Sequence, residues 1–153
     1  MTRPPARPLF GGRGASGLAH VVSSVVLCLG VLAGCPNQDA VERDQVLARI
    51  DALRDATLVP LDHRRQLLEA LRTTRTGLVL GSEARDACVA AYTDLIDAAE
   101  REEAARRSME SGERTDPLAV VKALDDAEKL LDRSRENMPG CDQAATRLRA
   151  YKP

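Results

Sequence analysis

The sequence predicts an all-α fold, a small antiparallel helical bundle of three to four long helices plus a short C-terminal helix. Three observations lead to this prediction. Alanine, leucine, glutamate and arginine, which are strong helix formers, dominate the composition. Apolar residues recur at spacings of three and four from about position 40 onward. Proline and glycine separate these periodic segments and mark the expected helix ends.

The first two helices are expected over about 39–57 and 60–76. Asn37 or Asp39 can cap the first helix, and the Val59-Pro60 pair ends it, because a residue before proline avoids the α region. Gly77 is a suitable C-cap for the second helix. The apolar stripes of the two helices consist of Val46, Leu47, Ile50 and Leu53, and of Leu61, Leu67, Leu68 and Leu71.

A third helix is expected over about 83–110, with Ser82 as its N-cap and residues 78–80 as an apolar link before it. Its stripe is formed by Cys88, Tyr92, Leu95, Ile96 and Ala99. The pattern becomes polar after Glu100. The pairs Glu102–Arg106 and Glu103–Arg107 stand four residues apart in the favourable order.

A loop over 111–115 leads to Asp116-Pro117, which is a strong helix start. We expect a fourth helix over about 117–137, ended by Pro139-Gly140, and a short fifth helix over about 141–150. The stripe of the fourth helix is Val120, Leu124, Ala127, Leu131 and Ser134, widened by Val121 and Leu130.

One spacing within this region matches a known repeat. Ala127, Leu131, Ser134 and Pro139 fall where the second helix of a tetratricopeptide repeat carries alanine, a large apolar residue, a small residue and proline. The first helix of such a repeat would fall partly on the 111–115 loop. The segment therefore resembles only half of a repeat, which leaves a degenerate tetratricopeptide-like binding module as one alternative.

Residues 1–34 have the three parts of a secretory signal peptide. The segment 1–16 carries three arginines and no acid, and an apolar segment over 17–34 follows, ending in small residues. The continuous apolar part, Val21–Ala33, is shorter than the roughly 20 residues that a spanning helix needs. An uncleaved anchor helix and an ordinary cleaved signal peptide are the alternative interpretations.

The end of this segment, Leu32-Ala33-Gly34-Cys35, resembles the lipobox of bacterial lipoproteins. The resemblance implies that the Cys35 thiol receives a diacylglyceryl group, that signal peptidase II cuts before Cys35, and that the new amino terminus is acylated with a fatty acid such as palmitate. Two or more acyl chains hold a protein stably on a membrane. Residues 35–40 would then be a short tether, and 41–153 the folded domain. In enterobacterial lipoproteins, a residue other than aspartate after the cysteine leaves the protein in the outer membrane. The resemblance, with Pro36 at this position, therefore implies the outer membrane rather than the inner membrane.

Composition excludes several classes of function. The three arginines of residues 1–34 leave with a cleaved signal, so acidic residues outnumber basic ones in the remainder. This balance predicts no nucleic-acid partner. Tyr92 and Tyr151 are the only aromatic residues after position 34, which is too few for stacked bases or an aromatic ligand pocket.

The cysteines allow one pairing within the domain. Cys28 lies in the signal segment and Cys35 in the lipobox, which leaves Cys88 and Cys141. An even pair in an exported protein predicts one disulfide, with two buried free thiols as the alternative. This disulfide would staple the last helix to the middle of the third.

The sequence offers little for catalysis. His63 is the single histidine after position 34, so a histidine-based metal site or proton relay is not expected. Cys88 lies in an apolar stripe, which is unlike the electropositive, exposed setting of a reactive cysteine. We expect no enzyme activity, cofactor, metal or small-molecule ligand. The carboxylates of the later helices are expected to form a solvated face; they are Asp94, Asp97, Glu100, Asp125, Asp126 and Glu128.

These observations predict a lipid-anchored, non-enzymatic helical interaction or structural module of the cell envelope, facing the periplasm. Its expected partners are the membrane, through lipid on Cys35, and another envelope protein. The charged end of the third helix, residues 100–110 with the following loop, is the expected contact surface. A periplasmic inhibitor or chaperone-like factor acting on an envelope enzyme or assembly complex is the main alternative.

Overall fold

The computed structural model describes residues 37–111 and 116–153 of the chain, and the regular secondary structure of this part is all helix, with no strand. It contains α1 (Gln38–Asp55), a short 3-10 turn η1 (Ala56–Leu58), α2 (Leu61–Arg72), α3 (Val79–Glu110) and α4 (Pro117–Ala150). The four helices pack together, so the predicted all-α bundle is confirmed.

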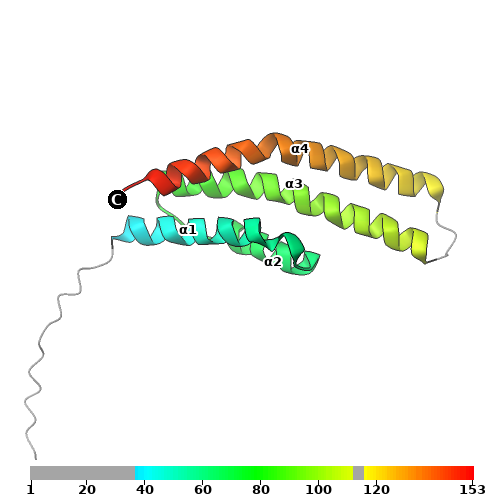
Figure 1. Ribbon diagram of the computed structural model, residues 1–153, viewed down its shortest axis with the longest axis horizontal. Helices are drawn as coiled ribbons and strands as arrows, with labels where there is room; N and C mark the ends of the chain where they lie inside the picture. Colours follow the sequence, from blue (N-terminus) through cyan, green and yellow to red (C-terminus); the bar gives the residue numbers. More distant parts are fainter. Residues whose placement is uncertain (1–36, 112–115) are drawn as a thin grey trace, which may run out of the picture. The chain divides into compact units, whose positions relative to one another are not determined.

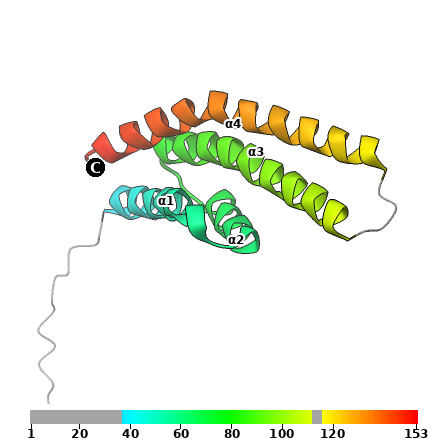
Figure 2. The same ribbon diagram turned by 45° about the vertical axis from the view of Figure 1, so that its right-hand side comes forward.

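The two long helices α3 and α4 lie side by side along their lengths as an antiparallel pair (Figures 1 and 2). Both bury a small residue at every seventh position, which is the repeat of helices that wrap around each other. The row on α3 is Ala84, Ala91, Ala98 and Ala105, and the row on α4 is Ala127, Ser134 and Cys141, followed by the larger Leu148. The Ser134 hydroxyl donates a hydrogen bond of 2.9 Å to the Ala91 carbonyl, so the two backbones approach closely.

The shorter helices α1 and α2 cover one side of this pair over only part of its length, as Figure 2 shows. The main core lies between them and the early part of α3 and late part of α4. Its buried aliphatic side chains include Val46, Ile50, Leu53, Leu68, Leu71, Ile96 and Leu148. A second, smaller core lies farther along the pair and contains Ala98, Ala127 and Leu130. Only α3 and α4 contribute to it.

The start of α3 is held by a glutamate of α1. Glu42 accepts hydrogen bonds from the Thr76 hydroxyl at 3.0 Å and from the backbone N–H groups of Gly77 at 2.5 Å and Leu78 at 3.2 Å. Hydrogen bonds from the Gln38 side chain and then from this turn hold the pKa of Glu42 below its usual value. The carboxylate thus satisfies backbone donors where α3 begins.

The boundaries of α2 and α3 differ from the prediction. The helix α2 ends at Arg72 with Thr73 as C-cap, so Gly77 does not cap it. The helix α3 begins at Val79, with Leu78 as N-cap, so Ser82 lies inside the first turn and donates its hydroxyl to the Val79 carbonyl. The earlier start follows from Glu42, a tertiary partner that local capping rules do not consider.

The break at Pro139-Gly140 and a separate fifth helix were also wrong predictions, because α4 continues through Pro139 to Ala150. Pro139 is exposed, whereas Ser134 and Cys141 on either side of it are buried against α3. Packing on both sides of the proline therefore outweighs the local loss of a backbone hydrogen bond.

The predicted caps of α1 and α4 are confirmed. The Asn37 side chain accepts a hydrogen bond from the backbone of Asp39, and Asp116 accepts one from Leu118. The start of α1 also contacts the end of α4. The Tyr151 hydroxyl donates a hydrogen bond of 3.0 Å to Asp39, and the Arg43 guanidinium donates one of 3.0 Å to the Tyr151 carbonyl. The first turns of α1 therefore lie beside the last turn of α4.

Candidate functional site

The lipobox-like sequence Leu32-Ala33-Gly34-Cys35 lies outside the described residues. Cys35 stands three positions before Gln38, where α1 begins. Three extended residues span at most about 11 Å, so any lipid on Cys35 would be tied closely to the start of α1. Within the described part of the chain, the helices are too short or too polar to span a bilayer.

The predicted disulfide is present. Cys88 of α3 and Cys141 of α4 form an S–S bond of 2.00 Å, with their Cα atoms 4.5 Å apart. Both residues are fully buried between the helices. The bond links the last third of α4, rather than a separate terminal helix, to the first third of α3.

One surface, the distal face, is defined here as the side of the end of α3 and the start of α4 that α1 and α2 leave uncovered. Large apolar side chains are exposed there: Met109 at 60%, Leu118 at 73%, Val121 at 61% and Leu124 at 42%. Leu58, in the turn between α1 and α2, is 98% exposed. Clustered exposed apolar side chains are typical of an interaction site, whereas scattered ones are normal.

The exposure of Val121 and Leu124 corrects the sequence prediction, which placed both in a stripe facing the core. The periodicity of α4 is as predicted, and the buried Ala127 and Leu130 follow in the same helix. The covering layer is shorter than the helix pair, however. The helix α2 begins at Leu61, beside Glu100, Glu103 and Arg107 of α3, so nothing in the described chain covers the pair beyond that level.

Charged residues surround the distal face. Glu103 and Arg107 form the predicted ion pair, 2.5 Å between Oε1 and Nη1. Arg106 pairs with Glu110 at 2.9 Å instead of with Glu102, so the predicted Glu102–Arg106 pair is wrong. Residues 112–115 of the loop expected to join this surface lie outside the described residues. The predicted contact region 100–110 therefore forms only part of the distal face, and the most exposed apolar residues belong to α4.

Several carboxylates expected to be solvated are engaged in ion pairs with other helices. Arg65 of α2 contacts Asp97 at 2.7 Å and Glu100 at 2.5 Å, and Arg133 of α4 contacts Asp94 at 3.1 Å. These pairs position α2 and α4 on α3. Among the described residues, no group of three or more histidine, cysteine or acidic side chains is arranged to hold a metal ion.

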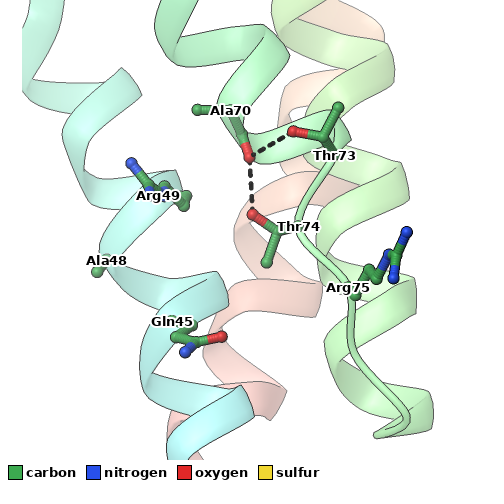
Figure 3. A pocket seen from close by; sticks show the side chains of 7 residues that line it. All are labelled: Gln45, Ala48, Arg49, Ala70, Thr73, Thr74 and Arg75. Carbon is green, nitrogen blue, oxygen red and sulfur yellow. Dashed lines mark hydrogen bonds between the residues drawn. The ribbon is translucent and has the colours of Figure 1, made fainter.

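A groove of about 530 Å³ between α1 and the end of α2 is a second candidate (Figure 3). Arg49 and Arg75 line it and form no ion pair within the described part of the chain. Figure 3 shows these arginines at opposite edges of the groove. The Thr73 and Thr74 hydroxyls donate to backbone carbonyls, including that of Ala70. Because its polar groups do not converge, we favour the distal face as the functional site.

Sequence reasoning missed the row of small residues on α3 and the exposed Leu118. Repeated alanine at positions 84, 91, 98 and 105 is a visible signal for close helix packing.

Comparison with known proteins finds no matching family, no matching curated protein and no matching solved structure at a significant level.

Proposed function

We propose that the chain is a lipid-anchored, non-enzymatic helical interaction module of the bacterial cell envelope. Its anchor is lipid on Cys35, and its contact surface for another envelope protein is the distal face. The observation that carries the proposal is the exposure of four large apolar side chains at this end of the helix pair, Met109, Leu118, Val121 and Leu124. Binding of a partner that removes these apolar side chains from water is favourable in free energy.

The anchor is supported by the lipobox-like sequence and by its closeness to the folded part. Cys35→Ala removes the thiol that a diacylglyceryl group would modify. The expected result is loss of incorporated radioactive fatty acid and accumulation of an uncut precursor. Labelling and membrane fractionation equal to those of the unchanged chain would contradict the anchor.

The contact surface is tested by photo-crosslinking in cells that produce the full chain. A photoreactive amino acid replaces Val121 on the distal face or, as a control, the exposed Ala90 on α3. We expect a discrete crosslinked envelope protein from position 121 and none from position 90. Equal adducts from both positions, or none from position 121, would contradict the proposed contact surface.

A further inference from the structure

The distal face continues the side of α4 that α1 covers. Because the helix pair repeats every seven residues, positions seven apart share one side of α4. One such row is Val121, Glu128, Arg135, Asp142 and Arg149. Asp142 and Arg149 contact α1, pairing with Arg54 at 2.6 Å and with Asp51 respectively. Val121 and Glu128 occupy the same row where the covering helices are absent.

A neighbouring row on α4 carries the apolar part of this surface. Ala145 is fully buried in the main core, and Met138 packs against it. Leu131 packs against the second core, and Leu124, the next member, is 42% exposed. The same row is therefore buried beneath helices at one end of the pair and uncovered at the other. The apolar side chains of this row at the uncovered end could pack against another helix that carries an aliphatic stripe.

The charges indicate which residues should flank that stripe. Arginines of both covering helices contact acidic residues of the pair, Arg54 of α1 with Asp142 and Arg65 of α2 with Glu100, and one pair has the opposite order, Arg149 of α4 with Asp51 of α1. On the distal face, Glu102 and Glu128 are exposed. Neither has an ion-pair partner among the described residues. Basic residues on an incoming helix would complement them.

We propose that the distal face binds an amphipathic helix of the partner protein, with an aliphatic stripe and basic flanking residues. The helix lies along α3 and α4 beyond the α1–α2 turn, where Leu58 is exposed and a hollow of about 430 Å³ borders Pro60 and Leu61. Its apolar stripe contacts Val121 and Leu124, and its basic residues contact Glu102 and Glu128. This inference rests on the proposed function and adds the chemistry of the partner.

A second copy of the chain fits this surface less well. Its own distal face would bring glutamates toward Glu102 and Glu128 instead of basic residues, and like charges disfavour association. The exposed apolar cluster is also small compared with the roughly 20–30 residues a side of a standard interface. Self-association is accordingly an outcome that the experiment must distinguish.

The test uses the full-length processed protein in nanodiscs of zwitterionic phosphatidylcholine, which limits binding of basic peptides to the lipid. The probes are fluorescent synthetic peptides of 18 residues. One is a leucine-striped helix with arginine flanks, the second has glutamate in place of arginine, and the third is a shuffled leucine–arginine peptide without a stripe. We expect the first peptide to bind at least about tenfold more tightly than the other two by fluorescence anisotropy.

Variants locate the binding. Val121→Glu should weaken binding of the basic peptide about tenfold or more, because it places a carboxylate in the apolar contact. Glu102→Lys combined with Glu128→Lys should reverse the preference toward the acidic striped peptide. Glu136→Lys changes an exposed, unpaired glutamate of α4 outside the distal face and should leave binding unchanged.

Equal binding of the basic and acidic peptides, binding of the shuffled peptide, or insensitivity to Val121→Glu would overturn the inference. So would crosslinking from position 121 only to a second copy. If position 121 crosslinks an envelope protein in cells but the basic peptide does not bind, the inference fails and the proposed function stands. If position 121 crosslinks nothing in cells, the proposed contact surface itself fails, whatever the peptides do.

Discussion

At the scale of single residues, Glu42 determines where a helix begins. Its carboxylate accepts hydrogen bonds from Thr76, Gly77 and Leu78, so the chain between α2 and α3 is fixed by a residue more than 30 positions earlier. Helix starts are usually satisfied by a local N-cap side chain. Here the side chain of Glu42, on another helix, accepts these hydrogen bonds, and Leu78 occupies the N-cap position.

Replacing Glu42 by glutamine should destabilise the fold in a pH-dependent manner. Hydrogen bonds lower the pKa of Glu42 in the folded state. A lowered folded pKa contributes stability above the unfolded pKa, and that stability is lost as pH falls through the folded value. Urea unfolding should show the unchanged chain to be the more stable at pH 7, with the difference shrinking below about pH 4.5. A constant difference across this range would contradict the role of the charge.

At the scale of elements, the α3–α4 pair depends on small side chains at seven-residue intervals. Ala98 is fully buried in the second core, whereas Ala90 on the same helix is exposed. Ala98→Leu should destabilise the protein by about 1–3 kcal/mol, because it overfills a close contact. Ala90→Leu should change the free energy of unfolding by less than about 0.5 kcal/mol. Chemical denaturation measures both, and similar effects of the two changes would argue against close packing at position 98.

Pro139 should be a source of instability within α4. It is exposed and cannot donate a backbone hydrogen bond, yet the helix continues past it. Pro139→Ala should raise the free energy of unfolding by about 1–3 kcal/mol, since proline is much less favourable than alanine inside a helix. Pro139→Gly should raise the free energy of unfolding by less than Pro139→Ala does. A loss of stability with alanine would contradict this expectation and indicate that packing of α4 on α3 needs proline at this position.

Pro139 also shows which parts of the fold the sequence could predict. The stripes of α1 and α2 and the caps at Asn37 and Asp116 depend on local patterns, and these predictions are confirmed. Local rules also place a helix end at Pro139-Gly140, but burial of Cys141 beyond it keeps the helix continuous. Contacts distant in sequence decide such cases, and one sequence carries no direct record of them.

The same limit applies to the candidate site. Periodicity correctly predicts that Val121 and Leu124 share a side of α4, but it cannot reveal how far α1 and α2 extend over that side. The two residues were therefore predicted to face the core, although they are exposed. The Cys88–Cys141 pair was predictable, because the remaining cysteines, Cys28 and Cys35, lie in or next to the signal-like segment.

At the scale of the whole molecule, the disulfide restricts the conformations of the unfolded chain. It closes a loop across 53 positions, which the chain-entropy account relates to about 4 kcal/mol of stabilisation. Cys88→Ala combined with Cys141→Ala should lower the free energy of unfolding by about 2–4 kcal/mol. The measurement is urea denaturation, with reductant added as a parallel arm. In the unreduced, unfolded protein, iodoacetamide should alkylate neither Cys88 nor Cys141.

The seven-residue repeat of the long helices has a consequence for changes in their length. Inserting seven residues into α3 after Ala98 and seven into α4 before Ala127 would lengthen the pair by about 10 Å and keep every side chain in its present orientation. Inserting five would instead rotate the distal face by more than a quarter of a turn relative to α1 and α2. Natural variants that differ in length between these points should therefore differ by multiples of seven in each helix.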